Sequence, residues 1–348
     1  MIGTGYAFAS GYLKGEEARL ITSEHVRRMS NAPSIQGVLE IIEDTDIGSY
    51  LREVTLMSFD DIDEHLWSYL HHCLQRLEWF RMVPTDLLKI SRAYIAKYDV
   101  LNVKAALWRV ATGRKVSMIP VGVLHSFGLL DRLADAENLG DVIEPLVSCK
   151  LRNYADILRE EEQRFSQGAR SRLQVEARLD NEYYRGMLNT AKASAESYMF
   201  CKALGIIIDL ANLQIVSRAM IEGLGPEVAE YTIGGGVMLS AETIAELLSL
   251  RLGDMPQRLE DFQYRDLAQE ISAGYDGTKS IAVVVETVEA HKFRLLKEIL
   301  APRVLSPLMI VYYLILKEAE IRNLRLILKA ILDGIPVMET RKYLVLAS

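Results

Sequence analysis

One motif constrains this chain more than any other feature: an acidic residue, an asparagine three positions later and a glycine fourteen positions later, repeated three times. The three asparagines lie 110 and 111 residues apart (212 − 102 and 323 − 212). Asparagine occurs only eight times, and after Asn189 only at motif positions, so chance recurrence of the whole pattern is improbable. We therefore predict a threefold internal repeat. Its motif residues are Asp99, Asn102, Gly113, Asp209, Asn212, Gly223, Glu320, Asn323 and Gly334.

The motif fits a helix that ends at its glycine. An acid and an asparagine three residues apart lie on one helix face. In the third copy, apolar residues from Ile321 to Ile335 recur every three or four positions, and Gly334 stands where a C-terminal cap favours glycine. Asparagine forms helices poorly, so its repeated use predicts a bond to something outside its own helix. We favour a structural amide in each copy over a ligand-binding role.

The repeat also sets the expected domains. Solenoid repeats run about 20 to 50 residues, so copies of about 110 residues are small domains rather than stacked helix pairs. We expect three related lobes, residues 1–119, 120–232 and 233–348, with the glycines at 234–236 at a flexible boundary.

Helical spacing dominates the chain, and the expected fold class is all-α. Helices are predicted from Pro84, Thr85 and Asp86 through Trp108, and over residues 153–165, 174–190 and 195–220. Ser240 is a predicted N-cap, and Ser306 with Pro307 a predicted helix start. Only Ile281–Val285 is a strand candidate, and it lies among helical spacings.

Composition argues against several classes. A net charge of −7 without a basic block disfavours a nucleic-acid role. Cys73, Cys149 and Cys201 show no paired spacing, which indicates neither a disulfide framework nor a zinc site. The longest purely apolar run, Leu308–Leu316, has nine residues, against about 20 for a bilayer-spanning helix. The first residues lack the pattern of a signal peptide, so we expect no direct bilayer span and no export by that route.

Motifs for catalysis and cofactors are weak. Gly277–Ser280 lacks the spacing of a phosphate loop, and His65 with His72 are two turns apart, too far to share a metal ion unaided. No cofactor is expected. One enzyme alternative remains: Asp60, Asp61 and Glu64 are similar to the magnesium-diphosphate motif of all-helical prenyl-transferring enzymes. Such sites need a second acidic cluster, which the sequence lacks, and Ser58 makes these acids the first turn of a capped helix.

A resemblance covers nearly the whole chain. Residues 306–334 resemble the C-terminal signature of the C subunit of archaeal and bacterial vacuolar-type ATPases, whose eukaryotic counterpart is the d subunit. The residues that carry it are Ser306, Pro307, Tyr313, Lys317, Glu318, Glu320, Asn323, Leu324, Arg325 and Gly334. The two earlier motif copies, and Asp44, Thr45 and Asp46 near Tyr50, are similar to the corresponding parts of that family. The N-terminal start departs from it, with Ser10 where arginine is common.

The resemblance implies three helical lobes in a pseudo-threefold funnel and no catalytic residues. It implies a central-stalk adaptor that couples the shaft of the soluble ATPase head to the proteolipid rotor ring, for proton or sodium transport. The partners would be the central shaft subunits and that ring. The protein would be cytoplasmic, held at the cytoplasmic face of the membrane through the ring.

Overall fold

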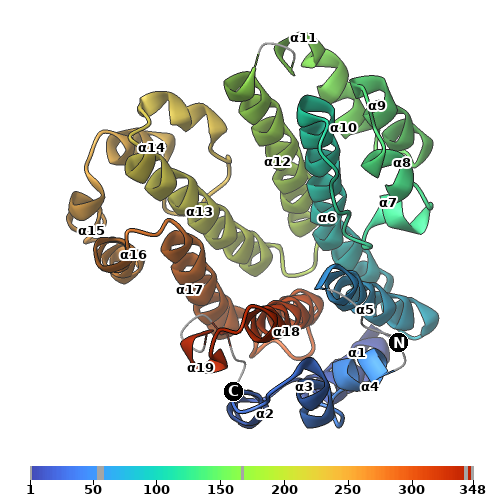
Figure 1. The fold of residues 1–348 in the computed structure, drawn as a ribbon. Helices are drawn as coiled ribbons and strands as arrows, with labels where there is room; N and C mark the ends of the chain where they lie inside the picture. The colour runs from blue at the N-terminus through green and yellow to red at the C-terminus, as the bar shows by residue number, and fades with distance from the viewer. Residues whose placement is uncertain (1, 53–58, 166–167, 341–343, 346–348) are drawn as a thin grey trace. The chain divides into compact units, whose positions relative to one another are not determined.

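The computed structural model describes residues 2–52, 59–165, 168–340 and 344–345. Within these residues every regular element is a helix and no strand occurs, so the predicted all-α class is confirmed (Figure 1). The strand candidate Ile281–Val285 falls at the start of helix α17 (Ala282–Leu300). This segment forms a helix instead of a strand because Val284 and Val288, four residues apart, are both buried on one helical face.

The backbone contacts divide the chain into two compact units. Unit 1 comprises Met1–Asp99, Met118–Leu130 and Leu300–Ser348, and unit 2 comprises Val100–Ser117 and Asp131–Ile299. The long helix α6 (Thr85–Thr112) contributes to both. Neither unit coincides with a predicted lobe, and the division into three lobes stays a prediction.

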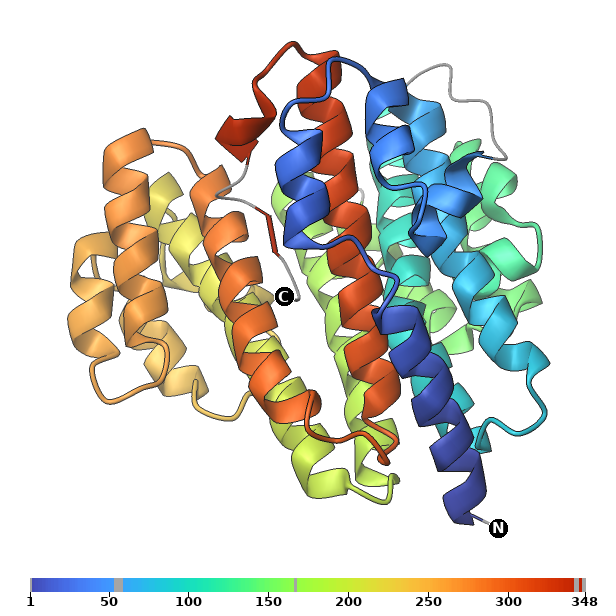
Figure 2. The same ribbon diagram turned by 90° about the horizontal axis from the view of Figure 1, so that it is seen from below.

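Unit 1 is built around α18 (Met309–Leu332), which packs against α1, α3, α5 and α19. Figure 2 shows α1 lying along α18. The remaining elements of the unit are α1 (Ile2–Glu17), α2 (Ser23–Met29), α3 (Ile35–Ile41), α4 (Asp46–Arg52), α5 (Phe59–Trp79), the first half of α6, α7 (Val123–Ser126) and α19 (Val337–Thr340).

The apolar run Leu308–Leu316 explains the central place of α18. Every residue of this run is buried, so the helix is covered on all sides in its first two turns. The helix begins at Met309, two residues after the predicted start at Pro307. The reason is local: the hydroxyl of Ser306 accepts the backbone N–H of Leu308 at 3.1 Å, which closes a turn before the first helical residue.

Unit 2 is built around the neighbouring helices α12 (Ala169–Lys192) and α13 (Ser197–Glu222), which pack side by side (Figure 1). One face of α13 joins a core of buried residues that includes Leu210, Leu213 and Leu247. The other elements are the second half of α6, α8 (Leu130–Ala134), α9 (Leu139–Ser148), α10 (Arg152–Glu160), α11 (Glu162–Phe165), η1 (Pro226–Tyr231), α14 (Ala241–Leu248), η2 (Leu252–Asp254), α15 (Met255–Arg258), α16 (Arg265–Thr278) and α17.

Most predicted helices are present. Helix α6 begins at Thr85 and covers the predicted segment, while α12 and α13 contain most of residues 174–190 and 195–220. Ser240 caps α14, because its hydroxyl accepts the N–H of Thr243. The predicted helix at 153–165 is interrupted at Glu161, which separates α10 from α11.

Within the described part of the chain, α13 is the one helix long and apolar enough to cross a membrane. However, 61% of its most apolar stretch is buried inside the protein. A core helix that is covered by its neighbours has the same composition. The apolar surface of α13 is therefore explained by the packing of unit 2.

Candidate functional site

The three motif glycines end their helices in the same conformation. Gly113, Gly223 and Gly334 have φ angles of 70°, 67° and 68° and follow the ends of α6, α13 and α18. This left-handed region favours a residue without a β-carbon. After α18 the N–H of Ile335 bonds to the carbonyl of Ala330 at 2.8 Å, which closes the helix end as the sequence of the third copy predicts.

The motif acids accept backbone N–H groups from other segments. Asp99 on α6 accepts the N–H groups of Val123 and Leu124 at 3.0 and 2.9 Å, and Glu320 on α18 accepts the N–H of Ile21 at 2.9 Å. Both side chains are buried. Burial raises the pKa of Asp99 to about 6, although the two N–H bonds oppose that shift.

The motif asparagines pair with the backbone of a later segment. Asn212 donates to the carbonyl of Ile233 at 2.8 Å and accepts its N–H at 2.7 Å. Asn323 makes the same two bonds with Val345, at 2.7 and 2.9 Å. Asn102 is also buried on its helix. The amides of Asn212 and Asn323 satisfy buried backbone groups, in line with the structural role favoured from the sequence, and the role of Asn102 stays a prediction.

In the second copy of the motif, the acid and the asparagine bond to both ends of one loop. The carboxylate of Asp209 accepts the N–H groups of residues 237, 238 and 239, and Asn212 holds Ile233. Asn181 on α12 accepts the N–H of Gly234 at 3.1 Å. We call residues 233–239 the glycine loop. Its residues belong to unit 2, and three side chains bond to it, while its place at a boundary between lobes stays a prediction.

The glycines let this loop lie close to α12 and α13. A β-carbon on Gly236 would come within 2.0 Å of Oδ1 of Asp209, and one on Gly235, with φ of 101°, within 2.6 Å of Leu188. Helix α13 contributes Gly205, where a β-carbon would meet Val237 at 2.2 Å. The loop backbone therefore needs glycine at its points of contact.

Beside the glycine loop the surface of unit 2 is hollowed by two adjoining cavities of about 690 and about 620 Å³. They share Leu188, Lys192 and Gly235. The larger is lined mainly by polar residues of α10 and α12. The smaller is lined by Lys192, Tyr198, Cys201, Lys202, Ile206, Val237, Met238 and Gln263, among others. We call the smaller cavity the loop groove and take it as the candidate functional site.

Sequence reasoning missed the loop groove. Leu188 and Val237 are 49 positions apart (237 − 188). No spacing rule connects them, because the contact depends on how α12 and the glycine loop pack. The only available signal was the run of three glycines, which indicates a close approach of the backbone.

The acidic run at the start of α5 includes a carboxylate that is paired within the protein. Asp63 pairs with Arg325, whose guanidinium donates to its carboxylate at 2.9 Å. No group of three possible metal ligands occurs among the residues that the structure describes. The side chain of Asp60 and all of Ser58 lie outside those residues, and Glu64 is exposed. The prenyl-diphosphate alternative therefore finds no support.

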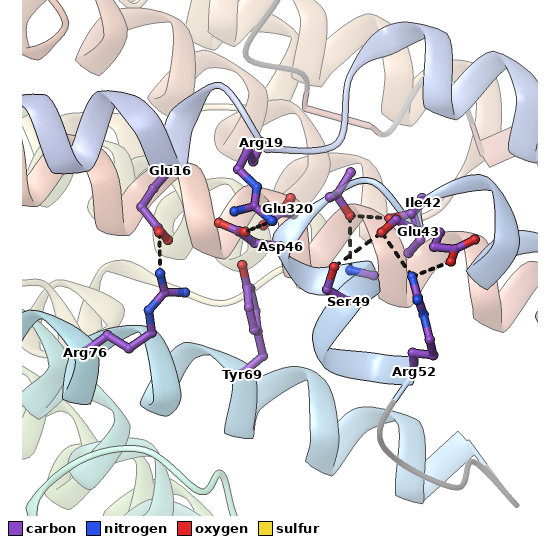
Figure 3. A network of polar contacts seen from close by, with 12 residues as sticks. Glu16, Arg19, Ile42, Glu43, Asp46, Ser49, Arg52, Tyr69, Arg76 and Glu320 are labelled. Atoms are coloured by element: carbon purple, nitrogen blue, oxygen red, sulfur yellow. Dashed lines mark hydrogen bonds and ion pairs between the residues drawn. The ribbon is translucent and has the colours of Figure 1, made fainter.

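Charged and polar side chains of α1, α5 and α18 contact one another in unit 1, and Figure 3 shows Glu16 of α1 facing Arg76 of α5. Glu16 pairs with Arg76 at 2.9 Å, and Lys317, with no exposed surface, donates to the hydroxyl of Tyr69 at 2.7 Å. Lys317 also lies 3.5 Å from Glu320. Pairing keeps each buried charge compensated. Since the partners are internal, this network holds the helices of the unit together.

The sequence is similar to known proteins along nearly its whole length. A family model described as ATP synthase (C/AC39) subunit matches residues 9–343. The A-type ATP synthase C subunit of Methanocaldococcus jannaschii is 23% identical over 350 residues, covering 98% of this chain and 86% of the relative. The same subunit of Pyrococcus abyssi is 23% identical over 340 residues, with 95% and 88% covered. That of Methanococcoides burtonii is 24% identical over 345 residues, with 94% and 90% covered.

Proposed function

Because the chain belongs to the ATP synthase (C/AC39) subunit family, we propose that it is the non-catalytic adaptor of the central stalk in a rotary A-type or vacuolar-type ATPase. It would couple the central shaft of the soluble head to the rotating membrane ring during proton or sodium transport. The observation that carries the proposal is the family match over residues 9–343.

The hydrogen bonds and ion pairs inside the protein are consistent with a role in transmitting force. The three repeat acids, together with Asn212 and Asn323, bond to the protein's own backbone, and Glu16 and Arg76 in Figure 3 are paired within unit 1. Such bonds stiffen a scaffold, because a buried polar group that loses its partner is costly. An adaptor that transmits torque needs this resistance to deformation.

We include three related lobes, residues 1–119, 120–232 and 233–348, in this proposal. We also propose that the protein lies at the cytoplasmic face of the membrane, held through the proteolipid ring. Two types of contact are required, one with the shaft and one with the ring.

Purification of the native complex tests the function. An affinity-tagged copy of the chain should bring down the nucleotide-binding subunits, the shaft subunits and the proteolipid, identified by mass spectrometry. The purified chain alone should hydrolyse no ATP and turn over no prenyl diphosphate. A tagged chain that is functional in the cell yet isolates without ATPase subunits would refute the proposal.

A further inference from the structure

The loop groove has an exposed apolar surface. Tyr198 is 77% exposed, Val237 49% and Met238 37%. They come from the start of α13 and from the glycine loop, and Leu188 of α12 also lines the groove. Three neighbouring large apolar side chains at one concave site indicate a surface that another molecule covers.

The charged side chains that line the two cavities differ in whether they are paired within the protein. In the larger cavity the carboxylates are neutralised within the protein: Asp156 pairs with Arg159 at 2.7 Å and Glu160 with Arg178 at 2.8 Å. Glu182 pairs with Arg185. In contrast, Lys192 and Lys202, which line the loop groove, make no ion pair with any residue that the structure describes. The groove therefore presents apolar surface beside two uncompensated positive charges.

We propose that the loop groove binds an amphipathic helix of a partner protein whose apolar face is bordered by aspartate or glutamate. Such a helix places apolar residues against Tyr198, Val237 and Met238 and its acidic border beside Lys192 and Lys202. Opposite charges at the rim set orientation and partner choice, while the apolar centre supplies most of the affinity.

The groove is suited to this partner because its wall is already ordered. Asp209, Asn212 and Asn181 hold the glycine loop at both ends. A preformed surface avoids the entropy of ordering a loop on binding. In the proposed adaptor the helix would belong to another component of the same ATPase, so naming that component rests on the proposed function, while the chemistry of the groove does not.

A peptide experiment on the purified full-length chain tests the groove directly. Cys201 lines the loop groove and is partly exposed, whereas Cys73 and Cys149 are buried, so the rate of alkylation at Cys201 reports occupancy. Two helical peptides are compared that share one apolar face, bordered by glutamate in one and by lysine in the other. The glutamate peptide should protect Cys201 at concentrations about tenfold lower.

The charge-reversed double variant Lys192→Glu and Lys202→Glu should invert this preference, while Lys115→Glu, an exposed lysine outside the groove, should leave it unchanged. Equal protection by both peptides, no protection by either, or a preference that survives the double reversal would overturn the inference.

The assembled complex gives a second readout. Acetylation of Lys192 and Lys202 and alkylation of Cys201 should be blocked in the complex and open in the free chain. If the chain isolates with the ATPase but these residues react equally in both states, the groove inference fails while the adaptor function stands. If no ATPase subunit is isolated, the function fails and the peptide experiment still decides the groove.

Discussion

Asn323 satisfies both polar groups of one backbone residue. Its amide accepts the N–H of Val345 and donates to its carbonyl, and the side chain is 3% exposed. Leucine at this position would leave these two groups without their partner. We expect Asn323→Leu to lower the free energy of unfolding by about 1 to 3 kcal/mol, measured by urea denaturation.

The matched control is Asn31→Leu, because Asn31 is exposed and lies in the short turn that follows α2. Its unfolding free energy should change by no more than about 0.5 kcal/mol. Equal effects of the two substitutions would show that the bonds to Val345 contribute nothing.

The buried carboxylate of Asp99 should make the stability of the folded protein depend on pH. Burial raises its pKa in the folded protein to about 6, above the ordinary value of 3.8 that applies when the chain is unfolded. The folded state then binds the proton more tightly, so the contribution of this group to stability rises as pH falls through about 6 toward 4.

The variant Asp99→Asn removes this titration. We expect wild-type protein to gain on the order of 1 to 3 kcal/mol relative to the variant between pH 7 and pH 4.5, measured by urea unfolding at both values. A difference between the two proteins that is the same at both pH values would refute the assignment.

At the scale of elements, the glycine loop and α13 approach closely. Replacing Gly236 by alanine would place a β-carbon 2.0 Å from the Asp209 carboxylate, which is fixed by its bonds to the loop. We expect Gly236→Ala to cost about 1 to 3 kcal/mol of stability and to increase the alkylation rate of Cys201, as the loop moves off α13.

Gly234 is the natural control, because it stands two residues earlier and no atom lies within 4 Å of the β-carbon that alanine would add there. Gly234→Ala should change the unfolding free energy by less than about 0.5 kcal/mol. Thermal unfolding and Cys201 labelling of both variants check the pair. A comparable loss in both would place the effect in backbone strain of the loop instead of the contact with Asp209.

At the scale of the whole molecule, the proposed adaptor must hold two partners by different means. Lys104 and Arg325, at equivalent motif offsets, already pair internally with Asp180 and Asp63. The lysines of the loop groove do not, and exposed charges are screened by salt over about 8 Å at physiological ionic strength. If the shaft supplies the helix that occupies the loop groove, binding to the isolated shaft should weaken more steeply with salt than binding to the isolated ring.

The variant Lys192→Gln with Lys202→Gln should reduce the salt dependence of shaft binding and leave that of ring binding unchanged. Titration of both interactions against sodium chloride measures this. If the wild-type protein bound the shaft and the ring with identical salt dependence, this would contradict binding of the shaft through charged groups.

The sequence alone determined what depends on neighbours along the chain. Helical spacing predicted the all-α class, and Thr85 predicted the start of α6. Ser240 predicted the cap of α14, and Gly334 predicted the end of α18. Each of these features is decided within a few residues by periodicity, capping and φ preference. The repeated asparagine also indicated a bond outside its helix, although not the identity of the acceptor.

Tertiary structure decided which distant groups meet. It gave Asn323 its partner Val345, paired Asp63 with Arg325, and brought Leu188, Tyr198 and Val237 to one groove. It also brought the side chains of Asn181 and Asp209 to the backbone of the glycine loop. These outcomes depend on how helices pack within unit 1 and within unit 2. The spacing of residues along the chain does not specify such contacts, because their energy arises only when separate elements exclude water together.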